Sequence, residues 1–247
     1  MRFLISNDDG IESNGIKAIA EKLSLDNEVM VVAPDGNRSA SSHSISISKS
    51  VKLKEYFGIK NCKSYALSGT PVDCIKFAKL HFKNFNPDVV IAGINKGHNL
   101  GTDILYSGTV SIACESAFFG NVAFAFSAFS LGESDFSLYA DYAVKIIEKL
   151  LPLSIPGDIW NVNFPDVDKD IKGVRITKLG KQLYTDEYKK VSADEYVLVG
   201  ELIEHDENDC DCDIELIKQG YITVTPISFD RTDFDKINKV KNLCEKL

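Results

Sequence analysis

The chain lacks any apolar run long enough to cross a membrane. A membrane-spanning helix needs about 20 predominantly apolar residues, and no stretch of the 247 residues approaches that length. The opening MRFLIS holds three apolar residues after Arg2, too few for a secretory signal. With 16 Gly, 7 Pro, 44% hydrophobic and 26% charged residues, the composition is that of a globular protein. We expect a cytoplasmic protein without a membrane partner.

The chain has fewer basic residues than acidic ones. There are 28 Lys and Arg against 36 Asp and Glu, and the formal net charge of −8 has the wrong sign for attraction to a nucleic acid backbone. We therefore exclude a nucleic acid polymer as a general partner. Eight of the acidic residues and only one basic residue fall between Glu201 and Lys218. We interpret this acidic segment as a solvated loop, since it lacks the glycine and spacing of an EF-hand.

Several short motifs are also missing. The chain has no G-x-G-x-x-G fingerprint and no P-loop, which argues against a Rossmann oxidoreductase and an ATP-driven protein. It has no G-x-S-x-G elbow for a hydrolase serine. Six cysteines are too few for a disulfide scaffold, so we expect reduced and mostly buried thiols. Cys210 and Cys212 form only a C-x-C pair, without a second pair at zinc spacing.

Apolar strands alternate with amphipathic helices through residue 151. The patterns predict strands at 3–6, 28–33, 64–67, 88–93 and 122–127, a strand or hairpin within 44–54, and helices near 16–23, 71–82, 110–119 and 139–150. This alternation indicates an α/β fold with a doubly wound, mainly parallel sheet.

The remainder of the chain has a different pattern. Strands are expected at 159–164, 174–179, 196–203 and 221–227, with a final helix near 237–247. We therefore expect one domain over 1–247, with an α/β core (1–151), a β-rich extension that protrudes or serves oligomerisation (152–234) and a C-terminal helix (235–247).

Polar loops follow three of the predicted strands, where ligands of parallel sheets bind. The first contains the adjacent carboxylates of Asp8 and Asp9, whose mutual repulsion a cation or protons must neutralise. A hard ion such as Mg²⁺ or Mn²⁺ would take these carboxylates with a hydroxyl such as Ser39 and an amide oxygen such as Asn95. The alternative, that Asp-Asp-Gly is a turn with a helix-capping acid, stays open at this point.

The third loop carries glycines at positions 93, 97, 101 and 108 and leads into a predicted helix. Such a bare backbone can turn its amides toward an anion at the start of that helix. Ser107, Gly108 and Thr109 are therefore the candidate phosphate cradle. His98 lies in the same loop, but its spacing alone does not make it a ligand.

Taken together, the motifs SNDDG (6–10), APDGNRSA (33–40), GTPVDC (69–74), the stretch 87–115, NVNFP (161–165) and GYITVTPISFD (220–230) resemble the SurE family. The resemblance implies a metal-dependent phosphatase, a 5′-nucleotidase that acts on nucleoside monophosphates, with a Rossmann-like core, a β extension, an exchanged C-terminal segment and a dimeric or tetrameric assembly. It implies one divalent cation per subunit on Asp8, Asp9, Ser39 and Asn95, and a phosphate near Asn95, Ser107, Gly108 and Thr109. Ala40 departs from the family, which frequently has Gly there.

Two routes to hydrolysis follow from these residues. A divalent cation can polarise the phosphoryl group and activate a water, or Asp8 or Asp9 can attack through a phosphoaspartyl intermediate. Hydrolysis of 3′-monophosphates and of short polyphosphate is a further expectation of the resemblance. A rival hypothesis from another class is a nucleotide-sensing protein, in which the same loops bind phosphate without turnover.

Overall fold

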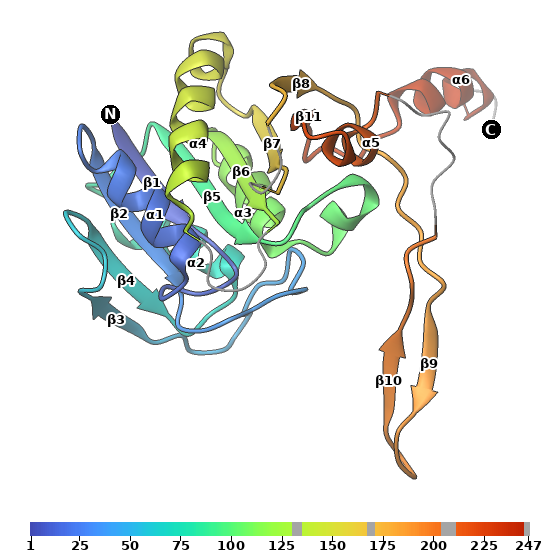
Figure 1. Cartoon of the computed structure of the whole chain (residues 1–247), viewed down its shortest axis with the longest axis horizontal. Coiled ribbons are helices and arrows are strands. Elements are labelled where there is room, and N and C mark those ends of the chain that lie inside the picture. The colour runs from blue at the N-terminus through green and yellow to red at the C-terminus, as the bar shows by residue number, and fades with distance from the viewer. Residues whose placement is uncertain (130–134, 167–170, 204–210, 245–247) are drawn as a thin grey trace.

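A nine-stranded sheet forms the centre of the molecule in the computed structural model, which describes residues 1–129, 135–166, 171–203 and 211–244 (Figure 1). Its strand order is β3-β4-β2-β1-β5-β6-β7-β11-β8. From β4 to β7 in this order, every pair of neighbouring strands is parallel. β3 pairs antiparallel with β4, and β11 pairs antiparallel with β7. The strands are β1 (Arg2–Ser6), β2 (Glu28–Pro34), β3 (Leu53–Tyr56), β4 (Lys63–Leu67), β5 (Val89–Lys96), β6 (Val122–Ala128), β7 (Ile159–Phe164), β8 (Val174–Ile176) and β11 (Ile222–Ile227).

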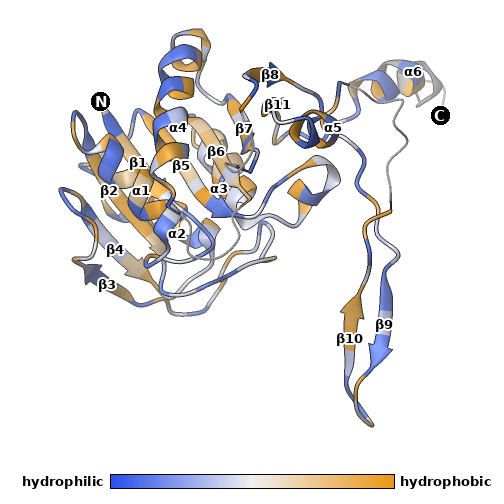
Figure 2. Cartoon of the chain, in the orientation of Figure 1, coloured by the Kyte–Doolittle hydropathy of each residue, from blue (hydrophilic) through white to orange (hydrophobic). Residues whose placement is uncertain are grey.

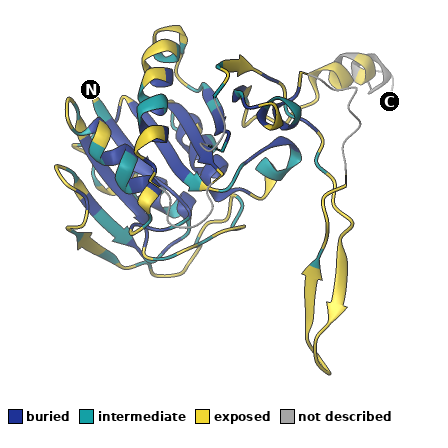
Figure 3. Ribbon diagram, in the orientation of Figure 1, coloured by how far each residue is buried: buried dark blue, intermediate teal, exposed yellow. Residues whose placement is uncertain are grey.

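Helices cover both faces of this sheet. On one face, Phe3 and Ile5 of β1 pack with α1 (Asn14–Leu23) and α4 (Ser137–Leu150). On the other face, Leu4 packs with α2 (Pro71–His81) and α3 (Gly108–Phe118). Because successive side chains of a strand point to opposite faces, the uninterrupted apolar strands fill both cores. The hydropathy and burial views show these apolar, buried strands at the centre (Figures 2 and 3). The doubly wound α/β fold is confirmed.

Part of the region expected as a β-rich extension (152–234) belongs to the central sheet, because β7, β8 and β11 lie in that sheet. A two-stranded arm of β9 (Glu187–Lys190) and β10 (Tyr196–Val199) projects from the body and is exposed along most of its length (Figures 1 and 3). Helix α6 (Phe234–Cys244) also lies away from the sheet (Figure 1). Short 3-10 turns occur at η1 (Gly101–Leu105) and η2 (Leu151–Leu153). None of the described helices is long and apolar enough to traverse a bilayer.

The strand or hairpin predicted within 44–54 is largely wrong. Only Leu53 begins a strand there, and β3 runs on to Tyr56. Ile45 and Ile47, whose alternation suggested a half-buried strand, are exposed. Side chains of α2, rather than a neighbouring strand, hold this segment through Thr70 and Asp73.

The solvated loop predicted for the acidic segment is wrong for its last part. Helix α5 (Asp213–Lys218) forms there, and Cys212, Asp213 and Ile214 are buried. The Asp213 carboxylate accepts hydrogen bonds from the amides of Gly101 and Gly180, at 2.8 and 2.7 Å. Residues 204–210, including Cys210, lie outside the described residues.

The closest approach of a helix to the sheet occurs at Gly15 in α1. A Cβ at this position would lie 1.9 Å from the carbonyl oxygen of Ile94. Alanine favours a helix interior by up to about 1 kcal/mol over glycine, but here it would force α1 away from β5. We expect Gly15→Ala to lower the free energy of unfolding by about 1–3 kcal/mol in urea denaturation. The neighbouring exposed substitution Asn14→Ala should change it by less than about 0.5 kcal/mol, and equal stability of the two variants would contradict the packing argument.

Candidate active site

Asp8 follows β1 at the carboxyl end of the sheet, and its carboxylate lies against the first turn of α3. The Thr109 hydroxyl donates to Asp8 Oδ1 over 2.5 Å, and the amides of Gly108 and Thr109 also donate to this carboxylate. A Cβ on Gly108 would lie 2.8 Å from Asp8 Oδ2, so a glycine is required at this contact. Burial raises the pKa of Asp8, and the hydrogen bonds from Thr109 and Gly108 oppose that rise.

Asp9 joins the end of β1 to the end of β5. Its Oδ2 accepts a hydrogen bond from the Lys96 amide over 2.9 Å. Burial is the main cause that raises the pKa of Asp9 to about 6, and the adjacent negative charge of Asp8 adds to it. The buried carboxyl of Asp8 and the half-buried carboxyl of Asp9, whose charged forms are both disfavoured, form a place where a cation is strongly stabilised.

Neither carboxylate caps the helix that follows it. Helix α1 begins at Asn14 after Ser13, and Ser13 makes no side-chain capping bond. Asn7 instead closes the turn, by donating to the Gly10 carbonyl and the Ser13 hydroxyl. The alternative of a turn with a helix-capping acid therefore does not hold for α1, whereas the Asp8 carboxylate does accept the first amides of α3.

Ser39 and Asn95 bring neutral oxygen atoms to the same region. The Asn95 side chain donates through Nδ2 to the Gly97 carbonyl over 2.8 Å, which leaves its Oδ1 as the atom that can bind a cation. Ser39 Oγ donates to Asn37 Oδ1 over 2.7 Å and keeps its lone pairs. The loop that carries Ser39 is attached to Asp8 directly, because the Arg38 amide donates to the Asp8 carbonyl over 2.7 Å.

A cavity of about 580 Å³ brings these positions together. Asp8, Ser39, Asn95 and Ser107 are among the residues that line it. Asp9, Gly108 and Thr109 support the wall through their bonds to Asp8 and Lys96, without lining the cavity themselves. Over the described ranges, no group of three or more His, Cys, Asp and Glu side chains is placed to hold a metal ion. Two carboxylates with a hydroxyl and an amide oxygen fit a hard ion such as Mg²⁺ or Mn²⁺.

Ser41 is a site residue that the sequence did not indicate. Its hydroxyl is buried and has no hydrogen-bond partner among the described residues. It lies beside the start of α3, because a Cβ on Gly108 would be 3.0 Å from Ser41 Oγ. A buried hydroxyl next to helix amides is a donor that an anionic oxygen can use. The one sequence signal that could have indicated Ser41 is its position two residues after Ser39.

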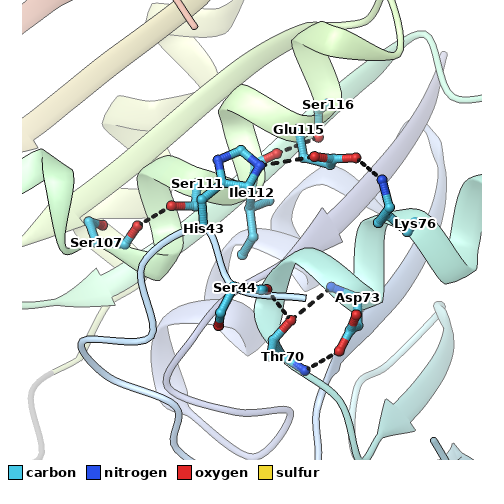
Figure 4. Close-up of polar contacts among 10 residues, drawn as sticks. All are labelled: His43, Ser44, Thr70, Asp73, Lys76, Ser107, Ser111, Ile112, Glu115 and Ser116. Carbon is cyan, nitrogen blue, oxygen red and sulfur yellow. Dashed lines mark hydrogen bonds and ion pairs between the residues drawn. The ribbon is translucent and has the colours of Figure 1, made fainter. Parts of the chain in front are cut away.

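The loop that carries Ser39 and Ser41 is held by charged side chains from two helices (Figure 4). Glu115 of α3 is buried and bonds to His43 Nε2 over 2.9 Å and to Lys76 Nζ over 2.6 Å. These hydrogen bonds hold the pKa of Glu115 below its usual value, although burial alone would raise it. The same loop is fixed further along by the first turn of α2.

The two hydroxyls of the predicted phosphate cradle already make hydrogen bonds within the protein. Ser107 Oγ accepts a hydrogen bond from the Val110 amide over 3.0 Å and so caps α3. The Thr109 hydroxyl is bonded to Asp8, and the residue is fully buried. Phosphate contact by Ser107, Gly108, Thr109 and Asn95 therefore stays a prediction, with Ser41 as an additional donor in the same place.

Further residues, which were not among the predicted ligands, complete the lining of the cavity. Asp103, Tyr106, Tyr184 and Asp186 line it, together with His98. His98 donates its Nε2–H to the Phe164 carbonyl over 2.8 Å, and burial lowers the pKa of His98, so its ring is neutral.

Known proteins that are similar to this chain match it over almost its whole length. The family model described as Survival protein SurE matches residues 3–186. A protein named 5′-nucleotidase SurE from Caldanaerobacter subterraneus subsp. tengcongensis is 42% identical over 97% of this chain and 96% of its own length. Another of that name from Clostridium beijerinckii is 40% identical, with 100% of both chains covered. The crystal structure of a SurE protein from Aquifex aeolicus is 35% identical, with a TM-score of 0.84 over 98% of this chain and 99% of that chain.

Asp73 provides a test of how the loop is anchored. It accepts hydrogen bonds from the amides of Ser46 and Thr70, at 3.0 and 2.8 Å. Burial alone would raise the pKa of Asp73, but these bonds hold it below the usual value. Because the folded pKa is the lower one, this stability is present above the unfolded pKa of about 3.9 and is lost as pH falls through the folded pKa. We expect Asp73→Asn to cost about 1 kcal/mol in urea denaturation near pH 7, and less near about pH 3. The exposed substitution Glu55→Gln is the control, and a cost of Asp73→Asn that does not change with pH would contradict the anchor.

Proposed function

This chain belongs to the SurE family, and on that premise we propose that its cavity hydrolyses nucleoside 5′-monophosphates to nucleoside and inorganic phosphate with one divalent cation. Relatives that carry the name 5′-nucleotidase SurE, at about 40% identity along the whole chain, make it a 5′-nucleotidase, a phosphoric monoester hydrolase. The observation that supports the metal dependence is the pair of carboxyls formed by the buried Asp8 and the half-buried Asp9, with Ser39 and Asn95 lining the same cavity as Asp8.

Asp8, Asp9, Ser39 and Asn95 are the residues that would hold the cation. When bound, Mg²⁺ or Mn²⁺ would withdraw charge from the phosphoryl oxygens and make a water more acidic. Without a cation, the two carboxylates would repel a phosphate. The local charge at this wall therefore matters more for substrate entry than the net charge of the whole chain.

The residues around the carboxylates position them and receive the phosphate. Thr109 fixes the orientation of Asp8, and the Lys96 amide fixes that of Asp9. The phosphate would lie near Ser41 and Ser107 at the start of α3, where hydroxyls and helix amides stabilise negative charge. Of the two carboxylates, only Asp8 lines the cavity. If hydrolysis proceeds through a phosphoaspartyl intermediate, Asp8 is therefore the carboxylate that would attack the phosphorus atom.

Two finer properties belong to the same proposal. Hydrolysis of 3′-monophosphates and short polyphosphate is proposed from the family resemblance. A homodimer or homotetramer is proposed as well. Its support is the apolar surface of the parts that project from the core, where Tyr196, Val197, Phe234 and Ile237 are exposed.

The phosphatase activity is tested by release of inorganic phosphate. We expect release from AMP, GMP, CMP and UMP in the presence of Mg²⁺ or Mn²⁺, and its loss on addition of EDTA, because the carboxylates then repel the substrate. Return of activity on restoring the cation is the control for irreversible damage. If no phosphomonoester is hydrolysed while nucleotides still bind, the chain is the nucleotide-sensing protein instead.

The metal assignment is tested by Asp8→Asn and Asp9→Asn. Each removes one charge of the pair, and we expect turnover of AMP to fall by at least about 100-fold in each variant. Asp26→Asn, an exposed substitution before β2 at the opposite end of the sheet, is the matched control. Circular dichroism should show all three variants folded. Wild-type turnover of both site variants at saturating Mn²⁺ would refute the assignment.

A further inference from the structure

Two asparagines of β7, Asn161 and Asn163, are fully buried. They belong to the motif NVNFP (161–165), to which the proposed function assigns no role. A buried amide costs free energy unless it finds hydrogen-bond partners, whereas an apolar side chain would fill the same space without that cost. These side chains therefore point to a role other than packing, and their partners show what they hold.

Both asparagines bind the main chain of Asn99, which follows β5 and is itself buried. The Asn99 amide donates to Asn163 Oδ1 over 2.8 Å, and Asn163 Nδ2 donates back to the Asn99 carbonyl over 3.0 Å. Asn161 Nδ2 donates to the same carbonyl over 2.9 Å. The side-chain amide of Asn163 supplies both a donor and an acceptor, which a carboxylate cannot do. The main chain at Asn99 is thus clamped to β7.

Ser127 of β6 holds the side chain of the same residue. Asn99 Nδ2 donates to Ser127 Oγ over 2.7 Å. In the sheet register, Ser127 is the partner of Asn95 on one side and of Asn163 on the other. Neighbouring strands lie about 4.8 Å apart. Asn99 is therefore bound to the row of the sheet that begins with the proposed cation ligand Asn95.

The segment 95–99 carries this anchoring back to the cation site. The Gly97 amide donates to the Ala128 carbonyl over 2.8 Å, and the Gly97 carbonyl accepts Asn95 Nδ2 over 2.8 Å. The second bond sets the orientation of the Asn95 amide. The Lys96 amide is the donor that orients Asp9. This segment therefore positions two of the four proposed ligands.

We propose that Asn163 is a positioning residue for the divalent cation: by clamping Asn99, it holds the segment 95–99 in the arrangement that binds the cation. The inference rests on the proposed function, which supplies the cation. Asn163 does not line the cavity and acts through Asn99, which does. Loss of an outer hydrogen bond that orients ligands typically weakens metal binding by roughly 10–100-fold.

Calorimetric titration with Mn²⁺ measures this effect without turnover. We expect Asn163→Ala, which removes both bonds to Asn99, to weaken Mn²⁺ binding by at least about ten-fold. Ser127→Ala removes one bond and one atom, so it should weaken binding by about three-fold and keeps the test decisive if Asn163→Ala does not fold. AMP turnover should fall in the same order at limiting Mn²⁺. It should largely recover at saturating Mn²⁺, because the ligands themselves are intact.

Asn121→Ala is the matched control. Asn121 is as buried as Asn99, with 7% of its surface exposed, and its side chain also makes two hydrogen bonds, with Lys79 Nζ and the Pro87 carbonyl. It precedes β6, at the opposite end of the sheet from the cation site. We expect this variant to be less stable in urea and to bind Mn²⁺ as the wild type does. Wild-type Mn²⁺ affinity in either folded anchor variant, or an equal loss of affinity in Asn121→Ala, would overturn the inference.

The wild-type protein tests the proposed function separately. If it binds no Mn²⁺ and hydrolyses AMP in the presence of EDTA, the metal dependence fails and this inference fails with it. If it binds Mn²⁺ without hydrolysing AMP, the phosphatase fails, and the Mn²⁺ titrations of the variants still decide the role of Asn163. If it binds Mn²⁺ and hydrolyses AMP, the phosphatase is upheld whatever affinity the variants have.

Discussion

The contact between the Asp8 carboxylate and the first turn of α3 is the constraint on which the site depends. Thr109 and the adjacent amides hold the side chain of Asp8, while its carbonyl accepts the Arg38 amide. One residue therefore joins the ends of β1 and β2 to the start of α3. Because Asp9 follows directly and is bonded to Lys96 at the end of β5, the three polar loops come together around a single pair of carboxyls.

The loop after β2 shows what this convergence requires of the backbone. Ala40, Ser42 and Ser48 adopt φ values of 56°, 52° and 58°, in the left-handed region that L-residues usually avoid at a cost of roughly 1–2 kcal/mol. The bonds of His43 with Glu115 and of Ser46 with Asp73 offset that cost. Ala40 is the position where the resemblance led us to expect glycine, and its positive φ is a conformation that glycine adopts without strain.

The core and the strand ends that carry Asp8 and Asn95 could be predicted because their signals are local. The capping box of Thr70 and Asp73 forms at the start of α2. Asp8 follows the buried strand β1, and Asn95 lies near the end of β5. The segment 44–54 was misjudged because alternating isoleucines resemble a strand when the tertiary anchors are unknown. Asp213 was misjudged because charge density suggests solvent, whereas its carboxylate satisfies buried amides at Gly101 and Gly180.

The part of the cavity lining that Tyr184 and Asp186 supply could not be predicted from the sequence. Tyr184 and Asp103 are 81 residues apart, and no periodicity or spacing relates the arm to η1. Contacts of this kind follow from how the extension packs on the finished sheet. Sequence reasoning therefore predicted the loops after β1, β2 and β5 as parts of the cavity lining, but not the contribution of the segment before the arm.

The long sequence separations within the site also bear on how the protein folds. Asp8 and Thr109 are 101 residues apart, and Asp9 and Lys96 are 87 apart. Contacts between distant residues form only after the entropy of closing a long loop has been overcome, which makes them late in folding. The two carboxyls thus share one environment only in a chain whose central strands have already paired. A ligand that binds them would raise the free energy of unfolding of the whole sheet, rather than that of one segment, in proportion to the logarithm of its concentration.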